Sequence, residues 1–262
     1  MQRWPSFLVL ARIKYGFGGK EVKQQMASLI ERERSVIVAA DVAEIKTLEK
    51  LVKETCQVEG IGGFKVSSAL VLNYGLPAVV STIRKHTKLP IIYDHQKGGT
   101  DIPVMGKRFA KVCSSAGVDA VILFPFGGAE TEISWLKACQ EEGLTVLVGA
   151  HMTQSRFLAS EGGFIADEAP EKIFRIAAEN GVRDFVVPGN KPEYVDKYKR
   201  LLEGLVGEGS FVLYAPGFIS QGGDINETGK VVGGKWHAIV GSAIYKSSDP
   251  KGAAEQITQQ IK

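Results

Sequence analysis

Eight short, nearly continuous apolar segments recur along the chain, and they constrain the fold more than any other feature. They occupy residues 35–41, 63–66, 89–94, 118–125, 144–150, 184–188, 211–217 and 237–241. Each is short and bounded as a buried strand is, and amphipathic helical patterns such as 171–178 lie between most of them. This alternation predicts a parallel sheet covered by helices, and eight units in 262 residues predict an α/β fold of the (β/α)8 TIM-barrel type.

The barrel is expected to occupy residues 35–262 as one domain, because no linker or low-complexity segment interrupts it and no dinucleotide-binding glycine pattern follows its first strand. Residues 1–34 precede it and are interpreted as an N-terminal helical extension that caps the bottom of the barrel or joins a subunit interface. The apolar run 7–11 is interrupted by Arg12 and Lys14, so it predicts neither a membrane span nor a signal peptide.

Composition excludes several classes of function. The formal net charge is +3 and the basic residues are spread out, which argues against nucleic acid. Cys56, Cys113 and Cys139 are odd in number and far apart, so no disulfide framework is expected and a cytoplasmic location is the simplest interpretation. No histidine pair has metal-binding spacing, and therefore no metal site is predicted. His95 and His151 follow strands and are within possible reach of a ligand.

Polar side chains cluster at the expected carboxyl ends of the strands, which all open on one face of a barrel. They are Asp41, Lys65, Asp94, Lys97, Asp101, Thr153, Gln221 and the Gly241–Ser242 pair. Charges buried in such a mouth cost several kcal/mol unless they are paired. Two lysines and three aspartates together therefore predict a catalytic charge network rather than a structural one.

Small residues fill the two loops after the last strands. The segments 216–224 and 241–245 contain Gly222, Gly223, Gly241 and Ser242, whose backbone N–H groups can approach a ligand closely. Loops after the seventh and eighth strands commonly hold phosphate in these barrels. The alternative is that these glycines only make tight turns; the pattern favours a phosphate site.

From residue 35 to the C-terminus the chain resembles the orotidine 5′-monophosphate decarboxylase family. The resemblance rests on Asp41, on Phe64–Val66, on the loop 94–103, on the segment 216–224 and on Val240–Tyr245. It implies cofactor-independent decarboxylation of orotidine 5′-monophosphate to UMP in pyrimidine biosynthesis, with a phosphorylated nucleotide as substrate and no metal or organic cofactor. It also implies a homodimer with shared active sites.

The resemblance assigns catalytic roles to four residues. Lys97 matches the lysine that protonates the carbon losing CO2, and Asp94 matches the carboxylate beside the substrate carboxylate. Asp101 matches the aspartate that enters the neighbouring subunit's site, accompanied by Ile102. Lys65 matches the lysine that orients this network and contacts ribose.

The resemblance also implies a set of substrate-binding residues. Asp41 corresponds to a ribose-binding aspartate, Thr153 to a serine that touches the pyrimidine, and Gln221 to a glutamine that bridges phosphate and base. The loop residues Gly222, Gly223, Gly241 and Ser242 then surround the phosphate.

Three positions depart from the family pattern. The loop from Asp94 through Lys97 to Asp101 is two residues longer than usual, Met105 replaces a threonine of the partner, and Ser242 replaces an arginine that holds phosphate. These departures leave open which group compensates at the phosphate and which substrate is used.

Two other functions remain open. A related barrel acting on a sugar phosphate, as a decarboxylase or aldolase, would use magnesium and an acidic residue on the second strand, where Lys65 stands here. A non-catalytic paralogue that binds a phosphorylated ligand would fit Ser242 and the longer loop, but it has no need of the costly Lys/Asp network.

Overall fold

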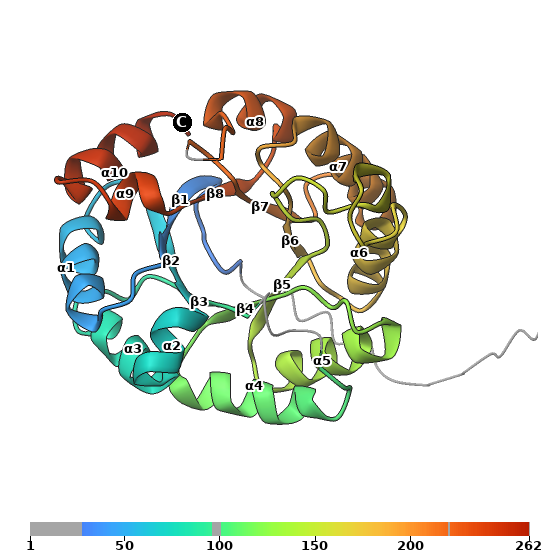
Figure 1. The fold of residues 1–262 in the computed structure, drawn as a ribbon, viewed down its shortest axis with the longest axis horizontal. Coiled ribbons are helices and arrows are strands. Elements are labelled where there is room, and N and C mark those ends of the chain that lie inside the picture. The colour runs from blue at the N-terminus through green and yellow to red at the C-terminus, as the bar shows by residue number, and fades with distance from the viewer. Residues whose placement is uncertain (1–27, 96–100, 220, 262) are drawn as a thin grey trace, which may run out of the picture.

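The computed structural model, which describes residues 28–95, 101–219 and 221–261, is a closed barrel of eight parallel strands in sequential order (Figure 1). The strands are β1 (Arg34–Ala40), β2 (Ile61–Ser67), β3 (Ile91–Asp94), β4 (Ala120–Leu123), β5 (Thr145–Gly149), β6 (Asp184–Val186), β7 (Val212–Pro216) and β8 (Trp236–Val240). Each coincides with one of the eight apolar segments, so the predicted TIM barrel is confirmed. The barrel closes where β1 pairs with β8.

Helices surround the barrel in a ring (Figure 1). They are α1 (Ile45–Thr55), α2 (Ser68–Tyr74), α3 (Leu76–Arg84), α4 (Met105–Ala116), α5 (Ala129–Glu141), α6 (Ala169–Glu179), α7 (Pro192–Val206), α8 (Ile225–Val232), α9 (Ser242–Tyr245) and α10 (Pro250–Gln259). Local chemistry sets several boundaries. Proline stands in the first turn of α6, α7 and α10. The Asp224 carboxylate caps α8 by accepting from the N–H groups of Asn226 and Glu227.

Two apolar cores hold the barrel together. One fills the interior of the barrel and includes Ile37, Ile92 and Ile122; the other lies between the strands and the helices. Strand side chains alternate between these cores because successive residues of a strand point to opposite faces. Lys65 pairs in register with Ala39 and Ile92, which both face the interior, and the same alternation therefore places the lysine inside the barrel.

Residues 28–33 close the amino-terminal end of the barrel. They form no helix, and Ile30 is buried in the interior core of the barrel. Lys235 holds this segment by donating to the Ser28 hydroxyl and the Glu31 carbonyl. The helix expected for the extension is therefore wrong for these residues, and strand β1 already begins at Arg34. The remainder of the predicted extension, residues 1–27, lies outside the described residues.

No helix within the described ranges combines the length and apolar character required to cross a membrane.

Candidate active site

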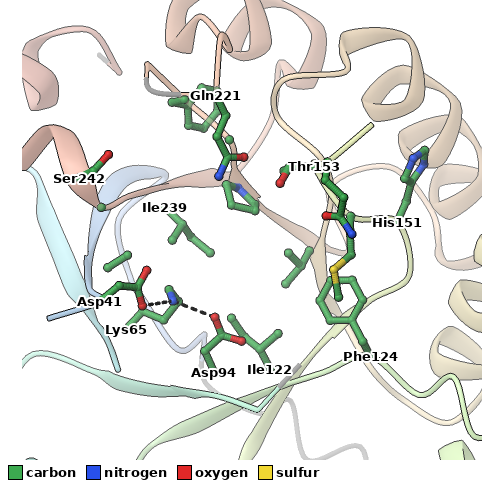
Figure 2. A pocket seen from close by; sticks show the side chains of 18 of the residues that line it. Asp41, Lys65, Asp94, Ile122, Phe124, His151, Thr153, Gln221, Ile239 and Ser242 are labelled. Carbon is green, nitrogen blue, oxygen red and sulfur yellow. Dashed lines mark hydrogen bonds and ion pairs between the residues drawn. The ribbon is translucent and has the colours of Figure 1, made fainter. Parts of the chain in front are cut away.

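A cavity of about 350 Å³ opens at the carboxyl end of the barrel. Eight of the residues singled out from the sequence line it: Asp41, Lys65, Asp94, His151, Thr153, Gln221, Gly241 and Ser242. They come from six different strands or the loops that follow them, and Figure 2 shows the side chains of Asp41, Lys65, Asp94, Thr153, Gln221 and Ser242 arranged around one space. The expected convergence at one face is thus observed for these residues.

Lys65 is the centre of the charged side of the cavity. Its ammonium nitrogen lies 2.7 Å from Asp94 Oδ2 and 3.1 Å from Asp41 Oδ1 (Figure 2). The Lys65 and Asp94 side chains are almost completely buried, whereas the Asp41 side chain is 43% exposed. The lysine is therefore held between one internal carboxylate and one that faces solvent.

These neighbours determine the charge of Lys65. Burial by itself lowers the pKa of the ammonium group, but the charges of Asp94 and Asp41, and the hydrogen bonds to both, outweigh it and hold the pKa above its ordinary value. Lys65 is consequently a fixed cation at neutral pH. It serves to orient two carboxylates and to donate a hydrogen bond, and it is unsuited to act as a base.

Apolar side chains form the floor and one wall of the cavity. Ile122, Phe124 and Ile239 point into it from β4, its following residues and β8 (Figure 2). These residues were not predicted from the sequence, although the inward alternation along each strand could have identified them. A planar, partly apolar ligand therefore finds both a dry surface and a charged edge in one cavity.

His151 follows β5, and both of its ring nitrogens contact protein groups. Nε2 lies 3.0 Å from the Lys191 ammonium nitrogen, and Nδ1 lies 2.8 Å from the Tyr198 hydroxyl. Burial, with the nearby charge of Lys191, lowers the pKa of His151 to about 4. The ring is neutral at physiological pH and ties the strand end to α7. His95 does not line the cavity; its ring packs against Phe109.

Other predicted site residues are not brought to this cavity. Asp101 and Ile102 are exposed and do not line it within their own chain. Gly222 and Gly223 also lie outside the lining; their backbone N–H groups donate to the carbonyls of Ile219 and Gly217. Lys97 lies outside the described residues.

The described residues contain no group of three or more histidine, cysteine or acidic side chains placed to hold a metal ion. Cys56, Cys113 and Cys139 are free, and burial raises the pKa values of Cys113 and Cys139 to about 12. The latter two are therefore packing residues rather than nucleophiles.

The fold and the site together define a TIM-barrel enzyme whose cavity holds a lysine between carboxylates. Residues 34–257 match the model of the "Orotidine 5'-phosphate decarboxylase / HUMPS family". The chain belongs to this family.

Named relatives agree with this assignment. The chain is 28% identical to orotidine 5′-phosphate decarboxylase of Methanosarcina barkeri over 88% of its own length and 96% of the relative's. It is 30% identical to the Pyrococcus furiosus enzyme of the same name, over 88% of this chain and 93% of that one.

Solved structures show the same barrel. Orotidine 5′-phosphate decarboxylase from Pyrococcus horikoshii superposes with a TM-score of 0.70 at 26% identity, covering 86% of this chain and 98% of that one. The Methanocaldococcus jannaschii protein, solved with the inhibitor BMP, gives a TM-score of 0.75 at 23% identity over 87% and 98% of the two chains.

Proposed function

We propose that this chain decarboxylates orotidine 5′-monophosphate to UMP, in pyrimidine biosynthesis, without a metal or organic cofactor. Family membership and the names of its relatives support the reaction. The observation that carries the proposal within the cavity is the buried Lys65 held between Asp94 and Asp41. A chain that only binds a ligand has no need to maintain a buried ion pair of this cost.

Different residues of the cavity are assigned to different parts of the substrate. Asp41, Lys65 and Asp94 lie together at one side of the cavity (Figure 2). We assign Asp41 and Lys65 to the ribose hydroxyls and Asp94 to the reacting edge of the base. Thr153 and Gln221 lie across the cavity, where a hydroxyl and an amide can recognise the polar edge of a pyrimidine. The apolar floor accepts the ring.

The chemistry requires breaking the bond between the pyrimidine ring and its carboxylate. The electron pair remains on the ring carbon, CO2 leaves, and a proton must reach that carbon. We assign this donor role to Lys97, and we assign to Asp94 and to Asp101 of a second copy the negative charges facing the substrate carboxylate. Electrostatic complementarity to the carbanion-like transition state supplies the rate enhancement.

At the proposed phosphate end, the described residues supply fewer cationic side chains than the family pattern does. Lys65 is the only lysine or arginine among the described residues that line the cavity, and Ser242 stands in the place of the usual arginine. Gly241 and Ser242 line the cavity directly, so their N–H groups and the Ser242 hydroxyl are the proposed donors. Gly222 and Gly223 would have to exchange their present loop hydrogen bonds to take part.

We further propose a homodimer in which Asp101 and Ile102 complete the site of the second copy. Two neighbouring apolar side chains on this segment, Ile102 and Val104, are 60% and 67% exposed. The segment is held on α5, because Trp135 Nε1 donates to the Ile102 carbonyl and Ser134 Oγ donates to the Pro103 carbonyl. A fixed, exposed apolar segment beside a carboxylate fits insertion into another subunit.

A cytoplasmic location is part of the proposal and is supported by the three free cysteines, which suit a reducing compartment.

Two other functions are distinguished by one assay. The family's joint description leaves room for a sugar-phosphate enzyme, which would need magnesium and an acidic side chain where Lys65 stands. A non-catalytic binder would bind UMP without turnover. CO2 release from orotidine 5′-monophosphate is measured with and without excess chelator. Equal release supports the proposal, whereas loss that magnesium restores, or UMP binding without release, contradicts it.

A further inference from the structure

Asn190 lies in the turn between β6 and α7, between two loops that carry cavity residues. Its side-chain nitrogen Nδ2 lies 3.0 Å from the carbonyl oxygen of Thr153 and 3.4 Å from that of Gln221. Thr153 belongs to the loop after β5 and Gln221 to the loop after β7. One amide group therefore donates to both loops.

The orientation of this amide follows from its surroundings. Both neighbouring loop atoms are carbonyl oxygens, which only accept hydrogen bonds, so the donating nitrogen must face them. The opposite atom, Asn190 Oδ1, is buried and has no hydrogen-bond partner in the described part of the chain. The two loop carbonyls are thus the polar contacts that fix the side chain.

Two glycines allow the loops to approach Asn190 closely. A Cβ atom added to Gly217 would lie 3.0 Å from Asn190 Oδ1 and 2.9 Å from Thr153 Cγ2, and Gly217 also has a positive φ of 106°. A Cβ atom added to Gly223 would lie 3.2 Å from the Asn190 Cα. The loop after β7 consequently packs directly over this turn, and its position depends on what occupies the turn.

Within the described ranges, the side chain of the next residue, Lys191, contacts one of the two loops. Its ammonium group donates to the Gln154 carbonyl at 3.2 Å, contacts His151, and pairs with Glu161 at 3.4 Å. All three partners lie at or beyond the end of β5. Lys191 therefore holds the loop after β5, whereas Asn190 joins that loop to the loop after β7.

We propose that Asn190 is a positioning residue that couples the loop carrying Thr153 to the loop carrying Gln221, so that occupation of the phosphate end favours binding of the base. The inference rests on the proposed nucleotide specificity and adds a residue to it. Asn190 does not line the cavity, and its effect is exerted through the two loops.

The test measures the coupling between the two ends of the cavity with two separate ligands, uridine and inorganic phosphate. The dissociation constant of uridine is determined by calorimetry with and without saturating inorganic phosphate. Phosphate should tighten uridine binding by about fivefold or more in the unmodified chain, and by less than about twofold in Asn190→Ala. Asn190→Ser, which keeps one small donor, is a second variant that should fall between them.

Two controls separate coupling from general damage. Lys191→Met should weaken uridine binding but keep the phosphate effect, and Asn73→Ala removes an exposed amide that donates to the Ala43 carbonyl and should change neither. An Asn190→Ala protein that keeps the full effect, or an unmodified chain without one, overturns the inference. Coupled binding without CO2 release would overturn the decarboxylase proposal alone.

Discussion

The Lys65 ammonium nitrogen lies 2.7 Å from Asp94 Oδ2, and both side chains are only 7% exposed. Asp41 gives the same nitrogen a second carboxylate that faces solvent. Each charge of this internal pair offsets part of the hydration that the other loses on burial. Stability and chemistry at this site are therefore linked through one lysine.

Lys65→Met should destabilise the protein as well as abolish turnover. Removing the cation takes the Lys65 ion pair away from the buried Asp94 carboxylate, and we expect the free energy of unfolding to fall by about 3–5 kcal/mol. Urea denaturation measures this change. Lys50→Met is the matched control, since the Lys50 side chain is 68% exposed and its Nζ makes only a long contact of 3.8 Å with Glu54 Oε1. The free energy of unfolding of this variant should change by no more than about 0.5 kcal/mol. Equal effects of both variants would contradict the argument.

The pH dependence of that difference follows from the raised pKa of Lys65. A lysine whose pKa is higher in the folded than in the unfolded chain stabilises fully below its unfolded pKa, about 10.4, and loses that contribution as pH rises through the folded value. The stability gap between the unmodified chain and Lys65→Met should therefore be constant from pH 6 to 9 and shrink only above about pH 10.4. A gap that closes near neutral pH would show that Lys65 is not the group responsible.

The contribution of Glu132 to the free energy of unfolding should instead fall as the pH rises through the neutral range. Its carboxyl is almost fully buried on α5, Oε1 has no hydrogen-bond partner in the described residues, and burial raises its pKa to about 8. A carboxyl with a raised folded pKa loses stability as pH rises from its unfolded value through the folded one. As the pH rises from 5 to 8, the free energy of unfolding of Glu132→Gln should therefore increase by about 2–4 kcal/mol relative to that of the unmodified chain.

The control for this substitution is Glu130→Gln, which changes an exposed glutamate on the same helix. Its unfolding free energy should follow that of the unmodified chain at every pH. A Glu132→Gln variant with the same pH profile as Glu130→Gln would mean that the buried carboxyl is ionised at little cost.

The barrel could be predicted because its signals are local. Each strand is a short apolar run, and the residue after it, such as Asp41, falls at the open face in any parallel barrel. Pairing of the charges at this face was also expected, since a lysine on a buried strand needs either a carboxylate nearby or a route to water. These inferences needed only alternation and the geometry of parallel strands.

The remaining features depend on contacts between distant loops. Nothing in the pattern around Asn190 indicates that its amide spans two loops, 37 and 31 residues away. Sequence favoured Gly222 and Gly223 as phosphate donors, yet their N–H groups bond within their own loop. The helix predicted before β1 was wrong for residues 28–33, because Ile30 packs in the interior core of the barrel and the segment around it is not helical.

Shared active sites predict complementation between two inactive variants. Lys97→Ala and Asp101→Ala should each be nearly inactive as homodimers. After subunit exchange, half of the dimers are mixed and each has one intact site, so about a quarter of the original activity should return. The measurement is CO2 release before and after mixing, with exchange followed by native mass spectrometry. Full exchange without recovered activity, or a monomer by sedimentation, would exclude shared sites.

Ser242 provides the sharpest test of the phosphate end. It lines the cavity beside Gly241, where a bidentate guanidinium is expected from the family pattern. Ser242→Ala removes one hydroxyl donor and should weaken UMP binding by about 1 kcal/mol, and Ser242→Arg should tighten it because the cavity gains a charge that matches phosphate. Calorimetric titration with UMP and with uridine measures both changes, and only the UMP values should move. Ser248→Arg adds the same charge at an exposed position outside the cavity lining and serves as the control. If Ser242→Arg and Ser248→Arg bind UMP equally, the phosphate lies away from the end of β8, and the assignment of Gly241 and Ser242 is wrong.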